Sequence, residues 1–190
     1  MRYNMVQPGF APVLSGAING RTAFAAMVKA IDQEPPTPTA LYLDFADVGV
    51  ATASYLRESV FALKAYLRNI GAKYYPVAAN ANDSVYDELL TIANAKNDAI
   101  ISCRLSFQGA VSDIALIGQL DPKQQMTFEL VNELKDADAG RLMQQYGEKE
   151  HVTSTTAWNN RLAGLAARGL IREFTRGRAK YYRPVLEVSE

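Results

Sequence analysis

Short apolar runs and helical patterns alternate along the first 120 residues. The apolar runs have the length of strands, and they comprise residues 40–45, 73–79, 99–105 and 114–118. Other segments repeat apolar residues at helical spacing, over residues 22–31, 52–69 and 84–95. Because strands that alternate with helices form a sheet flanked by helices, this part of the chain predicts an α/β domain.

Two of these helices carry a predicted inward face. In the helix over residues 84–95 this face consists of Val85, Leu89 and Ile92, and Asp83 is the expected N-cap. The helix over residues 52–69 is expected to close at Gly71, since glycine readily takes the left-handed conformation that ends a helix. Its predicted inward face comprises Tyr55, Leu56, Ser59, Leu63, Tyr66, Leu67 and Ile70.

The pattern changes after Leu120, where Asp121 and Pro122 match an N-cap followed by the first helical position. Gly177 can then provide the positive φ of a tight turn between two strands. The predicted helices cover residues 122–135, 137–146 and 153–168, and the predicted strands cover residues 170–175 and 178–183. Three helices followed by a hairpin are the layout of a winged helix-turn-helix. We therefore predict two domains, residues 1–120 and 121–190.

The composition is that of an ordinary globular protein, with 48% apolar and 21% charged residues among 190. No apolar stretch approaches the length of about 20 residues that spans a bilayer, and the first residues lack the pattern of a secretory signal. One cysteine, Cys103, and one histidine, His151, exclude an internal disulfide and a zinc site of Cys and His ligands. We expect a cytoplasmic protein that does not contact membranes.

The formal net charge is zero, but the charged residues are unevenly distributed. Residues 1–150 carry 13 basic and 17 acidic side chains, whereas residues 151–190 carry seven basic and three acidic ones. A basic C-terminal segment on an acidic body indicates that this end of the chain meets a polyanion.

The last predicted helix has two contrasting faces. Trp158, Leu162 and Leu165 lie within about 60° of one another at the helical repeat, so they are predicted to pack on the other two helices. The opposite face carries small polar residues that suit a helix in the major groove of DNA, where asparagine can pair with adenine. The predicted DNA-binding residues are Ser154, Thr155, Thr156, Asn159 and Asn160 of this face, Arg161 beside it, and Arg176, Arg178 and Lys180 of the hairpin.

Three segments near the C-terminus carry a family resemblance. Residues 152–162 read Val-Thr-Ser-Thr-Thr-Ala-Trp-Asn-Asn-Arg-Leu, residues 168–171 read Arg-Gly-Leu-Ile, and residues 176–182 read Arg-Gly-Arg-Ala-Lys-Tyr-Tyr. Together they resemble the recognition helix and wing of bacterial winged-helix regulators, over residues 122–188. Because such regulators usually bind DNA as two-fold dimers, the resemblance implies double-stranded DNA as the partner and a homodimer.

The N-terminal part carries a second resemblance. Gly20-Arg21 precedes a helix, residues 43–48 read Leu-Asp-Phe-Ala-Asp-Val, and residues 51–58 read Ala-Thr-Ala-Ser-Tyr-Leu-Arg-Glu. These segments resemble the STAS-like domain of unknown function, over residues 12–110. The resemblance implies a compact α/β domain like that of anti-sigma-factor antagonists, which exchange protein partners on phosphorylation. It implies a regulatory phosphosite at Thr52 or Ser54, although Gly-Val-Ala-Thr-Ala-Ser replaces the antagonists' Asp-Ser-Ser or Asp-Ser-Thr run.

Other chemistries find little support in the sequence. Asp44 and Asp47 lack the acidic pair and the lysine of a phosphoacceptor site, so Asp44 is predicted to bond nearby backbone amides. The segment 16–20 contains glycines but not the lysine of a phosphate-binding loop. Cys103 lies in an apolar run and is predicted to be a buried core thiol. We predict no catalytic residue, no metal site and no cofactor.

The sequence therefore predicts a non-enzymatic, DNA-binding regulator whose STAS-like domain responds to a signal or to a protein partner. Two alternatives stay open. One is a protein–protein signalling adaptor of the anti-sigma-antagonist type that does not bind DNA, and retention on heparin or random DNA as salt is raised distinguishes it. The other is a small-molecule sensor, which requires an apolar pocket in the α/β domain.

Overall fold

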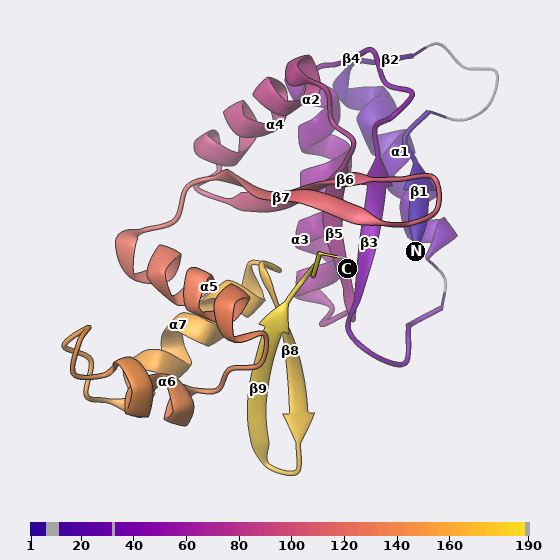
Figure 1. Cartoon of the computed structure of the whole chain (residues 1–190). Helices are drawn as coiled ribbons and strands as arrows, with labels where there is room; N and C mark the ends of the chain where they lie inside the picture. The colour runs from indigo at the N-terminus through magenta and orange to yellow at the C-terminus, as the bar shows by residue number, and fades with distance from the viewer. Residues whose placement is uncertain (7–11, 32, 189–190) are drawn as a thin grey trace. The chain divides into compact units, whose positions relative to one another are not determined.

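The computed structural model describes residues 1–6, 12–31 and 33–188 and shows a mixed α/β chain (Figure 1). No helix in these residues is both long enough and apolar enough to cross a membrane. The elements are β1 (Arg2–Asn4), β2 (Val13–Leu14), α1 (Ala17–Ala30), β3 (Thr39–Asp44), β4 (Val50–Ala51), α2 (Ala53–Leu56), the π-helical turn η1 (Arg57–Phe61), α3 (Ala62–Asn69), β5 (Tyr74–Ala79), α4 (Asp83–Ala95), β6 (Ala99–Leu105), β7 (Val111–Gly118), α5 (Pro122–Leu134), α6 (Ala139–Tyr146), α7 (Thr155–Ala167), β8 (Ile171–Arg176) and β9 (Ala179–Pro184).

The chain forms two compact units. Unit 1 comprises Met1–Gln119 and Leu186–Glu190, and unit 2 comprises Leu120–Val185. Unit 2 carries eleven basic and eight acidic residues, a formal charge of +3, and five of the basic residues lie in its last two strands and the turn between them.

Unit 1 is built on a central sheet whose described strands follow the order β1-β3-β5-β6-β7. The strands β1, β3, β5 and β6 are parallel, and β7 runs antiparallel to β6. A separate parallel pair joins β2 to β4. Because parallel strands end at the same edge of a sheet, Asp44, Asn80 and Leu105 lie together at the carboxyl edge of this one.

The core of unit 1 joins one face of this sheet to helices α1, α3 and α4, which Figure 1 shows on one side of the strands. Its buried residues include Leu41, Leu43, Ala78, Ile100 and Ile117 of the sheet and Met27, Leu56, Leu63, Leu67, Val85, Leu89 and Ile92 of the helices. The inward face predicted for α4 is therefore confirmed. The short strands β1, β2 and β4 were not predicted, because two or three residues are too few to show a period.

Two details predicted for the helices of unit 1 are wrong. Asn82, and not Asp83, caps α4, because Asn82 is the residue before the first helical turn and its Oδ1 accepts the Val85 N–H at 2.9 Å. Tyr66 and Ile70 of the predicted inward face are 36% and 57% exposed. The extra residue that η1 inserts rotates the following turns about the helix axis, so Lys64 faces inward in their place, while Leu67 is buried as predicted.

The π-helical turn has a local explanation in the contacts of its neighbours. The Ser59 hydroxyl donates to the Tyr55 carbonyl oxygen at 2.7 Å, which satisfies a carbonyl group in the irregular turn. A Cβ at Gly20 of α1 would lie 2.6 Å from the same oxygen, so only glycine lets α1 approach this closely.

In unit 2, α7 packs on α5 and α6, and β8 pairs with β9 in an antiparallel hairpin. Asp121 caps α5 as predicted, since its Oδ1 accepts the N–H groups of Lys123 at 2.9 Å and Gln124 at 3.0 Å. Trp158, Leu162 and Leu165 are fully buried, so the inward face predicted for α7 is confirmed. The helix begins at Thr155, two residues later than predicted, and the hairpin turn lies at residues 177–178.

Candidate functional site

The polar face of α7 is open. Its residues Ser154, Thr155, Thr156, Asn159 and Asn160 are all exposed, because the buried Trp158 turns the opposite face inward. Within the described part of the chain no group forms a hydrogen bond with these five side chains. Their donors and acceptors are therefore available to a ligand.

The start of α7 differs from the starts of the other capped helices. Thr52, Asn82, Asp121 and Asp138 each accept a backbone N–H at the first turn of α2, α4, α5 and α6. Ser154 occupies the same position in α7 but makes no such side-chain hydrogen bond. Backbone amides that no side chain caps are free to bind a phosphate group, which the helix dipole also favours.

The turn of the hairpin presents two exposed arginines, Arg176 and Arg178, on either side of Gly177. Gly177 has a φ of 62°, so the glycine permits the tight turn. The Arg176 guanidinium group lies 4.9 Å from the centre of the Tyr181 ring, which holds this arginine on one face of the hairpin.

The same face of the hairpin carries an aromatic pair. Phe174 and Tyr181 are opposite each other in β8 and β9, with ring centres 5.2 Å apart and ring planes at 19°. The Arg183 guanidinium lies 5.4 Å from both ring centres, and that of Arg172 lies 5.7 Å from Phe174. Three arginines therefore lie beside the two rings, and one of them, Arg183, also forms an ion pair with Asp136 at 2.9 Å.

Two of the predicted DNA-binding residues are engaged elsewhere. Lys180 lies on the other face of the hairpin from Arg176, because its cross-strand partner is Thr175, and its Nζ is 2.8 Å from Glu173 Oε1. Arg161 is half-buried with its guanidinium 5.1 Å from the centre of the Trp158 ring. The exposed residues of the predicted set that form no ion pair with another described residue are Ser154, Thr155, Thr156, Asn159, Asn160, Arg176 and Arg178, which we call the polar–basic set.

In unit 1 the polar side chains at the carboxyl edge of the sheet bind one another. The buried Asp44 forms an ion pair with Arg2 of β1 and accepts the Ala46 N–H at 3.1 Å and the Asn80 Nδ2–H at 2.8 Å. Asn80 also binds both backbone groups of Leu105, donating to the carbonyl at 3.0 Å and accepting the N–H at 2.8 Å. The prediction that Asp44 bonds a backbone amide is confirmed, and the network ties Arg2 of β1 to the carboxyl ends of β3, β5 and β6.

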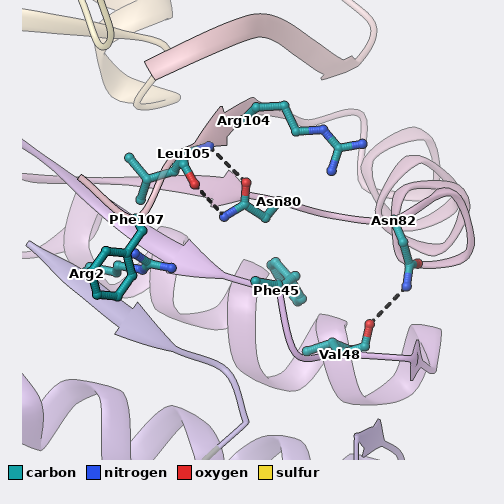
Figure 2. A pocket seen from close by; sticks show the side chains of 9 residues that line it. Arg2, Phe45, Val48, Asn80, Asn82, Arg104, Leu105 and Phe107 are labelled. Atoms are coloured by element: carbon teal, nitrogen blue, oxygen red, sulfur yellow. Dashed lines mark hydrogen bonds between the residues drawn. The ribbon is translucent and has the colours of Figure 1, made fainter. Parts of the chain in front are cut away.

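A pocket of about 460 Å³ lies at this edge (Figure 2). Figure 2 shows Arg2 and Phe107 at the left of the view, Arg104 at the top and Asn82 at the right. Phe107 is 97% exposed, and Asn82 donates to the Val48 carbonyl oxygen at 2.9 Å. The described residues that line the pocket are Arg2, Phe45, Ala46, Val48, Asn80, Asn82, Arg104, Leu105 and Phe107.

The two hydroxyl groups predicted as a phosphosite lie together at the start of α2. The Thr52 and Ser54 hydroxyl oxygens are 3.2 Å apart. Thr52 Oγ1 accepts the Gly16 N–H at 3.2 Å and the Tyr55 N–H at 3.4 Å, so it joins the start of α1 to the start of α2. In the structure the Thr52 hydroxyl is a helix cap.

Cys103 is buried in β6, as predicted. Burial raises the pKa of its thiol to about 11, with a smaller contribution from the Asp44 carboxylate, so the thiol stays protonated at neutral pH. Among the described residues, no group of three or more His, Cys, Asp and Glu side chains is placed to hold a metal ion.

No protein-family model and no curated protein matches this chain. What the two units can bind is therefore inferred from the residues of this chain alone. The pattern of the sequence did not reveal Arg2, Asn80, Arg104 or Phe107, because strand order brings these distant residues to one edge. The Phe174–Tyr181 pair could have been predicted from the sequence, because alternate residues of each strand of the hairpin face opposite sides.

Proposed function

We propose that this protein is a DNA-binding regulator whose unit 2 is a winged helix-turn-helix that binds double-stranded DNA. The observation that carries the proposal is the polar–basic set, in which no described group occupies the side chains of Ser154, Thr155, Thr156, Asn159 and Asn160. Three helices followed by an antiparallel hairpin support the winged-helix assignment.

Each part of the polar–basic set has a chemical role in this proposal. Asn159 and Asn160 read base edges in the major groove, where the asparagine amide matches the donor and acceptor of adenine. Ser154 and the uncapped start of α7 bind a backbone phosphate. Arg176 and Arg178 bind phosphates from the hairpin turn, and the Tyr181 ring positions Arg176 for that contact.

In the same proposal unit 1 is a STAS-like module that responds to a signal or a protein partner. The Leu43–Val48 segment that carries the resemblance contains Asp44 at the end of β3, and the following α2 starts at the Thr52 cap. Phosphorylation of Thr52 would turn its hydroxyl oxygen into a phosphate ester oxygen and add negative charge beside the N–H groups of Gly16 and Tyr55, which is a physical route from a modification to a change in unit 1.

The proposal is tested by measuring the affinity of the full chain for a labelled random-sequence duplex at several salt concentrations. The double variant R176A/R178A is expected to bind about tenfold more weakly, and its plot of log K against log salt is expected to be shallower by about 2, because two phosphate contacts are lost. Base recognition is tested with a duplex that the protein selects from random DNA. N160A should lower the preference of the protein for that duplex over random DNA.

The matched control is R21A/R57A. It removes two exposed arginines from unit 1 and leaves the charge of unit 2 unchanged. We expect this control to bind DNA like the unmodified protein. Equal affinities and equal salt slopes for R176A/R178A and the unmodified protein would contradict the proposal.

A further inference from the structure

The pocket at the carboxyl edge of the unit 1 sheet has the size of a ligand site. The volume of about 460 Å³ falls within the range of small-molecule pockets. All its lining residues belong to unit 1, so the site is independent of the DNA surface proposed for unit 2.

The pocket is positively charged where it is open. Arg104 is exposed, and within the described residues no hydrogen bond or ion pair holds its guanidinium group. It also borders a smaller hollow with Asp83 and Asp113, but neither carboxylate forms an ion pair with it. The described residues that line the main pocket include two arginines and no acidic residue.

Two further features favour an anionic group beside Arg104. Asn82, the N-cap of the 13-residue helix α4, lines the pocket, so the positive end of the helix dipole is directed at this region. Asp44 holds the Arg2 side chain by binding its Nε and Nη2. The third nitrogen of this guanidinium group, Nη1, takes no part in that ion pair. A guanidinium group and a helix start are a common combination for phosphate.

The rim of the pocket offers an aromatic surface. Phe107, in the β6–β7 connection, is 97% exposed, which is a high value for a large apolar side chain. Phe45 and Val48 add buried apolar surface to the pocket lining. A flat ring in a ligand would cover Phe107 and remove its apolar surface from water.

Hydrogen bonds hold the frame of the pocket. The amides of Asn80 and Asn82 are committed to the backbone, Asn80 to Leu105 and Asn82 to Val48, Gly49 and Val85. These two side chains hold the edge in place and leave ligand recognition to Arg104, Arg2 and Phe107. A preformed site of this kind loses little freedom when a ligand binds.

We propose that this pocket binds a small organic phosphate that carries a flat ring. The phosphate binds Arg104 beside the start of α4, and the ring stacks on Phe107. The probes that test the proposal are AMP and flavin mononucleotide, each compared with its phosphate-free nucleoside or riboflavin and with inorganic phosphate alone. Binding to the full chain is measured by calorimetry and, for the flavin, by fluorescence.

At least one phosphorylated probe should bind with a Kd on the order of 10–100 µM, as expected for a ligand of this size. R104A should weaken that binding about tenfold, since a hydrogen bond between charged groups is lost. The same variant should leave binding of the phosphate-free ring compound unchanged. F107A should weaken binding of the phosphorylated probe about threefold and leave inorganic phosphate unaffected.

The exposed variant R57A is the matched control, and it should bind the probe like the unmodified protein. Because Arg104 and Phe107 are exposed, both test variants should retain the melting temperature of the unmodified protein, which shows that lost binding is not lost folding. Absence of saturable binding by both AMP and flavin mononucleotide below about 1 mM, or equal affinities for R104A and the unmodified protein, would overturn the proposal.

Discussion

The two units use their polar side chains in opposite ways. At the sheet edge of unit 1, the side chains of Asp44, Asn80 and Asn82 are bound to other groups of the protein. On α7 of unit 2, the described residues leave the side chains of Asn159 and Asn160 without a hydrogen-bond partner. Asparagine therefore has a structural role in one unit, whereas in the other it is open to a partner.

Polar side chains that are bound within the protein and those that are open to a partner cannot be distinguished from the sequence alone. A buried polar group must find a partner within the protein, because leaving it unpaired costs free energy. An exposed polar group is satisfied by water and can exchange that water for a ligand. The contrast predicts that substitutions of the bound polar side chains at the sheet edge change stability and that substitutions on the open polar face of α7 change binding.

The largest expected difference in stability is between the variants D44A and N160A. Removing the Asp44 carboxylate leaves Arg2, Asn80 and the Ala46 N–H without their acceptor, so we expect the free energy of unfolding to fall by about 3 kcal/mol. N160A removes an exposed side chain and should change stability by less than about 0.5 kcal/mol.

Denaturant unfolding of the full chain, followed by far-ultraviolet circular dichroism, measures both variants. The fluorescence of Trp158, the single tryptophan, reports on unit 2 during the same titration. A loss of stability in N160A as large as that in D44A would remove the distinction between the two units.

A smaller effect is expected from a matched pair of helix N-caps. T52A removes an oxygen that accepts two backbone N–H groups, so it should destabilise the protein by about 1 kcal/mol, and T52S should restore most of that loss. S154A removes a hydroxyl that caps nothing, so stability should stay the same while affinity for random duplex DNA falls about threefold.

The same denaturation and DNA titrations measure the cap variants. If S154A destabilises the protein as much as T52A and leaves DNA affinity unchanged, Ser154 is a structural cap and does not belong to the polar–basic set.

Much of the fold could be predicted from the sequence, because its elements are long enough to show a period. The apolar runs that form β3, β5 and β6, the Asp121 cap and the inward face of α7 all follow from local spacing. The short strands and η1 could not be predicted in this way. Strand β1 has three residues and owes its place to pairing with β3, about forty positions away in the chain.

The candidate sites also differ in whether the sequence could predict them. The polar face of α7 could be predicted because residues at helical spacing share a face. The pocket could not, because it needs Arg2, Asn80 and Arg104 from three separate strands or strand ends. The engagement of Lys180 with Glu173 depends on the strand register, which fixes the side of the hairpin on which each residue lies.

The most direct test of the DNA-binding proposal is a map of the residues that a duplex contacts. The 20.9 kDa chain is labelled with ¹⁵N, and its amide signals are followed as random duplex DNA is added. We expect the largest shifts at residues 154–160 of α7 and at residues 176–178 of the hairpin, with the sheet edge of unit 1 unchanged. Shifts confined to unit 1, or signals that do not move as the duplex is added, would contradict a DNA interface in unit 2.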